Sequence, residues 1–332
     1  MNKLYSILIF LFSFSHLLAF EEIDPSTYSL LLGTVRKEIV SKAFRNIPSK
    51  NNISLLQMLN TIKKTKDSFS LSDAESAYLV YIWVTEYIKV DFLDNNKYVE
   101  NVYNSGKGNP VGVSNLFNLM CNYIKIESKS ISGYIKKRNV DNFENYISSI
   151  ESTWNYIVIN NKYYLIDVTL GSGVFNEKYL YSYYQDIYFA TKPEIFINSH
   201  FPNDKKWQLL SNPYSYEKYK SLPFISDFFY ICGFKTFSPD NMEINGRGEI
   251  KITLTYGELV NCKFISTFFV NPYLRDDIGV NNKINNSNGK FEIILNKNNK
   301  DALLFIIQCL PPYRAWDQDF SIITYKLNPT NN

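Results

Sequence analysis

The sequence predicts an α+β fold in two parts, a core of helices and antiparallel strands followed by a small antiparallel β-sandwich. Three observations support this. Apolar residues recur at helical spacing in the first third of the chain, a β-hairpin pattern spans residues 152–173, and apolar and polar residues alternate beyond about residue 240. At 332 residues the chain can form two domains with a sizeable core.

Helical spacing dominates the first third of the chain. Between residues 27 and 65, apolar residues recur every three to four positions in two runs that Pro48 separates. The serine and glutamate spacing from Ser70 to Glu75 indicates a capped helix start, and an apolar run to Ile88 follows it. Another helix is expected to begin near Pro110, because proline at the first helical position removes no intrahelical hydrogen bond.

Strand patterns dominate the rest. β-branched and aromatic residues on both sides of a polar turn at Asn160, Asn161 and Lys162 predict a β-hairpin that leaves through Gly171 and Gly173. Period-two alternation around residues 250–254 predicts a strand, and further runs predict strands at 263–270, 290–296, 302–309 and 320–327.

Three segments resemble motifs of the transglutaminase-like superfamily. Residues 106–117 are similar to Gly-x-Gly-Val-Cys-x-Gly-Tyr-Ser-Asn-Leu-Phe, and residues 152–171 to His-x-Trp-Asn followed by Tyr-Leu-x-Asp-x-Thr-x-Gly. Residues 188–210 resemble the Tyr-Phe, Pro-Glu, His-Phe-Pro and Trp-Gln-Leu-Leu tract of the kyphoscoliosis-peptidase type. The resemblance covers roughly residues 35–225 and implies a papain-like transglutaminase core.

The resemblance also implies where a catalytic triad would stand. In that family a cysteine thiolate attacks an acyl carbon, a histidine moves the proton and an aspartate orients the imidazole. Here Pro110 stands at the cysteine position, Ser152 at the histidine position and Asp167 at the aspartate position. Because a pyrrolidine ring has nothing to ionise and Ser152 has no imidazole, we expect a catalytically inactive protein, a pseudoenzyme.

The other residues that match the family motifs are expected to shape the vestigial cleft or the fold: Gly112, Trp154, Asn155, Tyr164, Thr169, His200 and Trp207. Asp167 itself is expected to accept hydrogen bonds from the hairpin backbone. Cys121 lies about three turns along the helix that starts at Pro110, so we expect a buried small hydrophobe rather than a substitute nucleophile. The sequence lacks the motifs of a P-loop, a dinucleotide site or a zinc peptidase, so no cofactor or metal is expected.

Composition limits the classes of partner and of metal site that the chain is expected to have. A net charge of +3 does not favour nucleic acid, whose binding normally needs clustered lysine and arginine. The four cysteines, Cys121, Cys232, Cys262 and Cys309, show no zinc spacing, and the three beyond residue 230 favour one disulfide there.

The N-terminus predicts export. Lys3 precedes an apolar run from Leu4 to Phe20, which is the layout of a signal peptide cleaved after Ala19, with a signal anchor as the alternative. Sequons at Asn52 and Asn285 fit a secreted glycoprotein. We therefore expect a signal peptide at 1–20, a transglutaminase-like domain at 21–230 whose helical part reaches about residue 68, and an immunoglobulin-like β-sandwich at 231–332.

These observations predict a secreted pseudoenzyme that binds or scaffolds a protein partner, with no nucleic acid and no membrane span after signal removal. Two alternatives stay open. One is a hydrolase or transferase with a rearranged site that uses Ser152 or a displaced thiol. The other is a purely structural extracellular protein, which a content of 26 tyrosines and 24 phenylalanines would suit. The sequence leaves the ligand and the oligomeric state open.

Overall fold

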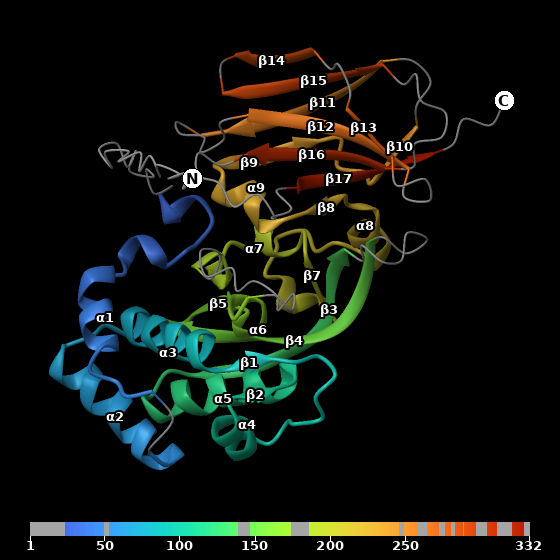
Figure 1. The fold of residues 1–332 in the computed structure, drawn as a ribbon. Helices are drawn as coiled ribbons and strands as arrows, with labels where there is room; N and C mark the ends of the chain where they lie inside the picture. The colour runs from blue at the N-terminus through green and yellow to red at the C-terminus, as the bar shows by residue number, and fades with distance from the viewer. Residues whose placement is uncertain are drawn as a thin grey trace, which may run out of the picture.

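The computed structural model describes residues 24–49, 53–138, 147–173, 186–245, 249–257, 264–271, 276–279, 283–287, 289–296, 304–310 and 321–328. Helices and a five-stranded sheet form the N-terminal part, and two further sheets form the C-terminal part (Figure 1). The predicted α+β class is confirmed. The signal-peptide region and the Asn52 sequon lie outside the described residues.

The helical elements follow the predicted order. They are η1 (Pro25–Thr27), η2 (Leu32–Thr34), α1 (Lys37–Phe44), α2 (Leu55–Ser68), α3 (Asp73–Tyr87), α4 (Val99–Ser105), α5 (Pro110–Tyr123), α6 (Val168–Gly171), α7 (Pro193–Phe196), η5 (Lys205–Gln208), α8 (Tyr216–Ser221) and α9 (Asp227–Ile231). The predicted capping box opens α3: the Ser72 side chain accepts from the Glu75 N–H, and the Glu75 carboxylate accepts from the Ser72 N–H.

The helix expected from residue 27 begins later than predicted, at Lys37, and short 3₁₀ turns precede it. Tertiary contacts explain the difference. Ser29 forms an isolated β-bridge with Thr191, and the Leu30 N–H donates to the Ala190 carbonyl. The backbone there pairs with a strand far along the chain, so it cannot also form helical hydrogen bonds.

The core sheet has the strand order β6-β5-β4-β3-β7 and is antiparallel throughout. Its strands are β3 (Ser128–Arg138), β4 (Ile147–Ile159), β5 (Lys162–Ile166), β6 (Phe189–Thr191) and β7 (His200–Pro202). Asn160 and Asn161 have φ of 51° and 58°, so a two-residue turn joins β4 to β5 and Lys162 already belongs to β5. The hairpin exit is the short helix α6 rather than an extended segment.

Two layers cover this sheet. Helices α3 and α5 pack against β4, and α5 also packs against β3, on one face. On the other face, Trp154, Leu165 and Phe196 belong to a second cluster of buried side chains, with Trp207 at its margin. A small parallel pair, β1 (Lys89–Val90) and β2 (Lys107–Gly108), lies beside α4 and α5.

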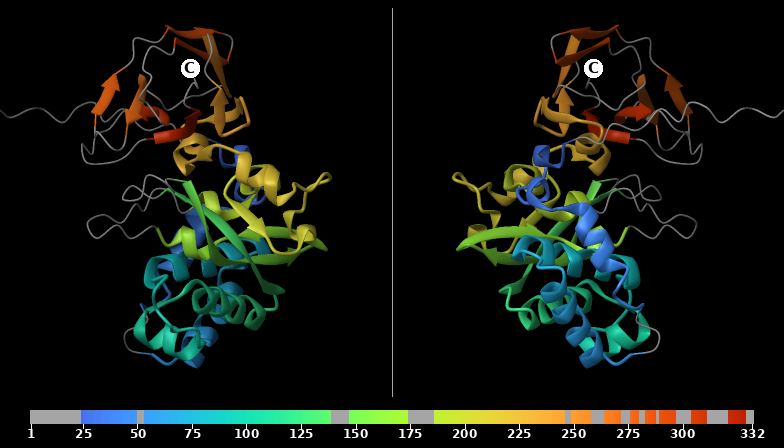
Figure 2. Two further views of the ribbon diagram at one scale, coloured as in Figure 1. Left: turned by 90° about the vertical axis from the view of Figure 1, so that its right-hand side faces the viewer. Right: turned by 90° about the vertical axis from the view of Figure 1, so that its left-hand side faces the viewer.

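The C-terminal residues form two sheets at the end of the molecule opposite the helices (Figure 2). One has the order β10-β17-β16-β12-β13 with β8 also paired to β17, and the other has the order β14-β15-β11-β9. Their strands are β8 (Phe224–Ile225), β9 (Phe234–Ser238), β10 (Glu243–Asn245), β11 (Glu249–Tyr256), β12 (Phe264–Asn271), β13 (Asp276–Gly279), β14 (Lys283–Ser287), β15 (Lys290–Asn296), β16 (Leu304–Leu310) and β17 (Ser321–Asn328).

These pairings are antiparallel except for β10 with β17, which is parallel. Strand β8 lies before the predicted boundary at residue 230 yet pairs with β17, so the two parts are joined by more than the chain itself. The division at 230 and 231 stays a prediction, as does the glycan at Asn285, whose backbone lies in β14.

Cys121 and Cys232 are both buried and reduced. The pairings of Cys232 with Cys262 or with Cys309 are therefore excluded. The remaining pairing, Cys262 with Cys309, falls outside the residues whose side chains the structure describes. Within the described ranges, none of the helices combines the length and apolar composition needed to cross a bilayer.

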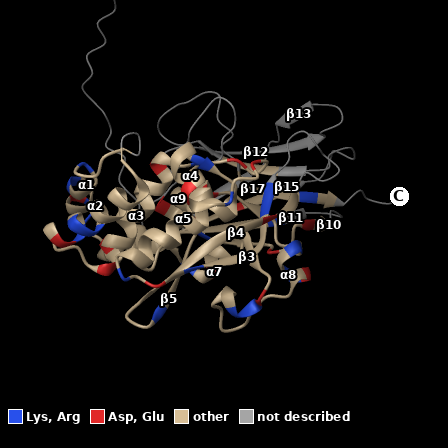
Figure 3. Cartoon of the chain, turned by 90° about the horizontal axis from the view of Figure 1, so that it is seen from below, with Lys and Arg blue, Asp and Glu red and all other residues tan. Residues whose placement is uncertain are grey.

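Charged side chains of both signs are interspersed over the described residues in the view from below (Figure 3). This distribution agrees with the small net charge of +3.

Candidate functional site

The start of α5 is the place where the resemblance put a cysteine. Asn109 is the N-cap and its side-chain oxygen accepts from the Gly112 N–H at 2.9 Å, with Pro110 buried at the first helical position. A Cβ on Gly112 would lie 2.6 Å from the Asn96 carbonyl oxygen, so glycine is required for the loop before α4 to approach. The predicted helix start is confirmed, and its first residue carries no ionisable group.

One turn further, α5 is fastened to β4. The Asn155 side-chain amide donates to the Ser114 carbonyl at 3.0 Å, to the Ser114 hydroxyl at 2.9 Å and to Asn118 Oδ1 at 2.8 Å. Asn155 is fully buried. Its side chain thus links helix α5 to strand β4, which is a structural role.

Ser152 lies two residues before Trp154 on β4, so both side chains point to the face of the sheet opposite Asn155. Ser152 Oγ and Trp154 Nε1 are buried and have no hydrogen-bond partner among the described residues. The Trp154 ring meets the His200 ring edge to face, with centroids 5.1 Å apart. Ser152 therefore shares a face with His200 but has no base bonded to its hydroxyl.

Asp167 ends β5 and is the N-cap of α6. Its Oδ1 accepts from the Thr169 N–H at 2.6 Å, the Thr169 hydroxyl at 2.5 Å and the Leu170 N–H at 3.0 Å. Its Oδ2 lies 2.9 Å from His200 Nε2, and both side chains are completely enclosed. The prediction that this carboxylate serves the hairpin backbone is confirmed, and the structure adds an imidazole partner.

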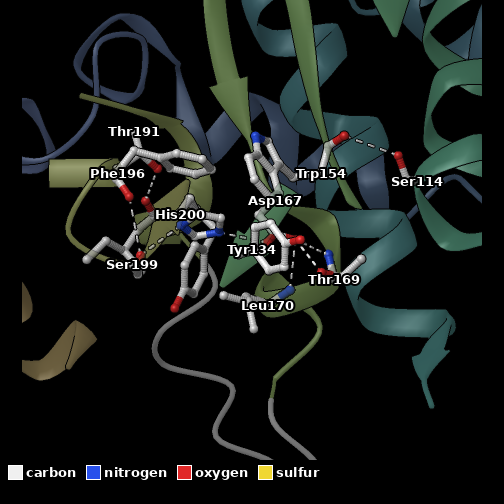
Figure 4. A network of polar contacts seen from close by, with 12 residues as sticks. Ser114, Tyr134, Trp154, Asp167, Thr169, Leu170, Thr191, Phe196, Ser199 and His200 are labelled. Carbon is white, nitrogen blue, oxygen red and sulfur yellow. Dashed lines mark hydrogen bonds and ion pairs between the residues drawn. The ribbon is translucent and has the colours of Figure 1, made fainter. Parts of the chain in front are cut away.

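His200 completes a short chain of polar contacts (Figure 4). A carboxylate can only accept, so Nε2 carries the hydrogen that is donated to Asp167, and in the neutral imidazole Nδ1 accepts from the Ser199 hydroxyl at 2.7 Å. The Phe196 ring stacks on the imidazole with ring centroids 3.7 Å apart, and the Tyr188 ring meets the imidazole edge-on with centroids 6.1 Å apart. Aromatic rings thus enclose the imidazole.

The remaining predicted residues lie away from this network. Trp207 stacks on Tyr156 with centroids 4.4 Å apart, and Lys206 lies 5.2 Å from the Trp207 ring centroid. Tyr164 pairs with Ile157 across the hairpin and packs against the main core. The contacts of Trp207 and Tyr164 are therefore packing contacts.

The structure therefore brings Trp154, Asp167 and His200 into one network, with Ser152 on the same face. The meeting of Pro110 with Ser152 and Asp167 stays a prediction. Pro110 begins the helix that Asn155 links to β4, whereas the Ser152 side chain points to the opposite face of that strand.

Sequence reasoning missed the contact between Asp167 and His200. One signal could have found it: His200 supplies the only imidazole after the predicted signal peptide, and a buried carboxylate needs donors. The chemistry left in this region is limited. Burial raises the pKa of the Cys121 thiol far above its ordinary value, and no cluster of histidine, cysteine or acidic residues able to hold a metal occurs among the described residues.

Comparisons with known proteins match this part of the chain. The family model of the transglutaminase-like superfamily matches residues 60–168, which include the start of α5 and the β4–β5 hairpin. Kyphoscoliosis peptidase of Mus musculus is 28% identical over 193 residues, 54% of this chain and 29% of the relative. The Homo sapiens protein of the same name is 26% identical over 193 residues, again 54% of this chain and 29% of the relative.

Among solved structures, a putative protease from Parabacteroides distasonis is 14% identical, with a TM-score of 0.25, and the match covers 39% of this chain and 26% of that chain. The present chain spans less than a third of the length of the two kyphoscoliosis peptidases.

Proposed function

We propose that this chain, which belongs to the transglutaminase-like superfamily, is an exported protein that binds a protein partner and performs no thiol-based acyl transfer. The observation that carries the proposal is Pro110 at the first position of α5, where the resemblance places the nucleophile. A helix N-terminus lowers the pKa of a thiol and favours the thiolate, and proline supplies nothing for that field to act on.

The state of the other two triad positions supports the loss of acyl transfer. Ser152 has no hydrogen-bond partner among the described residues, so nothing there accepts or relays a proton. Both oxygens of the Asp167 carboxylate already have partners, Oδ1 in the backbone of α6 and Oδ2 in His200. A triad acts as one unit, and without a nucleophile the covalent route is absent.

Exposed apolar side chains in the loop before α4 and at the start of α5 support a binding role. Leu93 is 92% exposed, Tyr98 67%, Phe92 43% and Val111 41%. The loop that carries the first three packs against the α5 start, since the Asn109 N–H donates to the Asn96 carbonyl at 3.1 Å. Large apolar side chains gathered at one place on a surface typically mark a protein contact.

The binding role can be tested by comparing surface variants in a pull-down with the mature chain. Changing both Leu93 and Tyr98 to serine should weaken partner capture at least about tenfold, since truncating a central apolar or aromatic anchor commonly costs about 2 kcal/mol of binding energy. Leu56→Ser is the matched control, because Leu56 is 60% exposed on α2 rather than in the loop before α4. Equal capture by both variants and the parent would contradict the assignment of this surface.

A second candidate function is favoured by the contacts of Ser199. Its hydroxyl, His200 and Asp167 follow one another in the order of a serine hydrolase relay. Against it, the Ser199 hydroxyl also lies 3.4 Å from the Phe196 carbonyl oxygen, and the Phe196 ring stacks on the imidazole. These contacts favour a structural network, and the covalent-probe measurement that ends the Discussion decides between the two.

Export is the third part of the proposal and rests on the apolar run from Leu4 to Phe20. Protein collected from the culture medium should begin near Phe20 or Glu21 when its N-terminus is sequenced. Exported material that begins at Met1 would show that the run is not a cleaved signal.

A further inference from the structure

A small cavity lies where the core meets helix α9. Helix α9 packs against β9 and β17, and Figure 1 shows it between the core sheet and the C-terminal sheets. The cavity volume of about 10 Å³ is the space that about one water molecule needs. Its polar lining residues come from the core and from α9: Tyr188, Thr191, Asn198, Ser199, Asp227 and Tyr230.

On the core side of the cavity, Ser199 presents a hydrogen-bond acceptor. The His200 Nε2–H is donated to Asp167, so the Ser199 hydroxyl donates its own hydrogen to His200 Nδ1 at 2.7 Å. The hydroxyl oxygen keeps two lone pairs, and no N–H or O–H of the described residues is donated to it. The polar chain that starts at Asp167 therefore ends, at the cavity, on an oxygen that can still accept.

On the α9 side, Asp227 presents a second acceptor. The Tyr188 hydroxyl donates to Asp227 Oδ1 at 2.6 Å. A carboxylate has a second oxygen, Oδ2, and within the described part of the chain no group donates to it.

Tyr230, one turn further along α9, presents a donor. Its hydroxyl oxygen accepts from the Asn198 amide nitrogen at 2.6 Å, and the same nitrogen lies 3.2 Å from the Glu194 carbonyl oxygen, which can only accept. The nitrogen is thus the donor in both bonds. The hydrogen of the Tyr230 hydroxyl has no acceptor among the described residues.

The cavity is therefore lined by one donor, the Tyr230 hydroxyl, and by two acceptors, Ser199 Oγ and Asp227 Oδ2. A water molecule donates two hydrogen bonds and accepts two, so it can satisfy all three groups at once. An ammonium ion or a monovalent metal ion would suit the two acceptors but cannot accept the tyrosine hydrogen. The donor set thus favours water over a cation.

We propose that the cavity binds one ordered water, which accepts from Tyr230 and donates to Ser199 and Asp227. The water extends the chain of Asp167, His200 and Ser199 to α9. Bridging waters are nearly as favourable in enthalpy as direct hydrogen bonds. Because α9 packs against β9 and β17, this bridge fastens the polar network of the core to the C-terminal sheets.

A crystal structure of the mature chain tests the site directly, at a resolution that shows ordered waters. A solvent peak should lie within about 2.5–3.0 Å of Ser199 Oγ, Tyr230 Oη and Asp227 Oδ2. A second crystal is soaked in thallium acetate, because thallium replaces monovalent cations and gives an anomalous signal. No anomalous peak should appear at this place.

A thermodynamic cycle tests the bridge in solution, with unfolding constants measured by urea denaturation. Ser199→Ala and Tyr230→Phe each remove one partner of the water, although the two side chains share no direct hydrogen bond. Once one partner is gone the water is weakly held, so the second substitution costs little more. The unfolding constant of the double variant should be at least about threefold smaller than the two single effects multiplied together.

The control cycle pairs Ser199→Ala with Tyr325→Phe. Tyr325 is also buried, but its hydroxyl donates to the Pro239 carbonyl at 2.9 Å and it does not line the cavity. The effects of this pair should multiply independently.

Four results would overturn the proposal. They are a crystal without solvent at this place, a thallium peak there, independent effects of Ser199→Ala and Tyr230→Phe, and equal coupling in the control cycle. Coupling without a solvent peak would place the link in the backbone between Asn198 and Ser199 instead. If a variant does not fold, the two crystals of the parent chain decide alone.

Discussion

Replacing Asp167 with alanine is expected to lower the free energy of unfolding by about 3–5 kcal/mol, because several buried donors lose their acceptor at roughly 1–3 kcal/mol each. The carboxylate is fully enclosed and accepts from Thr169, Leu170 and His200. Its removal leaves two backbone amides and an imidazole N–H buried without acceptors. Since folded domains are stable by only about 5–15 kcal/mol, the variant should be close to unfolding at ambient temperature.

Urea denaturation followed by circular dichroism measures this change, and Asp204→Ala is the matched control. Asp204 also caps a helical turn and pairs with a lysine, but its side chain is 54% exposed, so water replaces the lost contacts. A much smaller loss is expected there. If the two alanine variants lose equal stability, Asp167 does not hold the fold together in the way its contacts indicate.

Local patterns in the sequence predicted the elements that carry the site. The first turn of α5 is set by the N-cap Asn109 and by Pro110, whose lack of an N–H is harmless only there. The β4–β5 hairpin follows from apolar runs on both sides of Asn160 and Asn161, which tolerate the left-handed turn. In each case the residues that determine the structure are neighbours in the chain.

The same reasoning failed where distant residues decide the structure. Around Leu30 the spacing suits a helix, but the Leu30 N–H is donated to the Ala190 carbonyl, so strand pairing prevails. The partner of Asp167 was missed for a similar reason, since His200 lies 33 residues away on a different strand of the sheet, β7. A hydrophobic pattern carries no information about which buried donor reaches a given carboxylate.

The absence of a thiol at position 110 is read from the sequence alone, because it depends on residue identity. Proline at position 110 cannot become a thiolate in any conformation. What the sequence could not predict is that Ser199 stands beside the imidazole that now holds Asp167. This contact makes a serine nucleophile the strongest rival to an inactive site.

Covalent labelling of the folded parent protein tests the central claim most directly. The mature chain is incubated with a fluorophosphonate, which traps activated serines, and separately with iodoacetamide, and modified residues are mapped by mass spectrometry. The account predicts no fluorophosphonate adduct on Ser152 or Ser199 and no iodoacetamide adduct on Cys121, which the urea-unfolded chain should form readily. A stoichiometric fluorophosphonate adduct on Ser199 that disappears in Ser199→Ala would contradict it and establish the relay of Ser199, His200 and Asp167 as a working nucleophilic site.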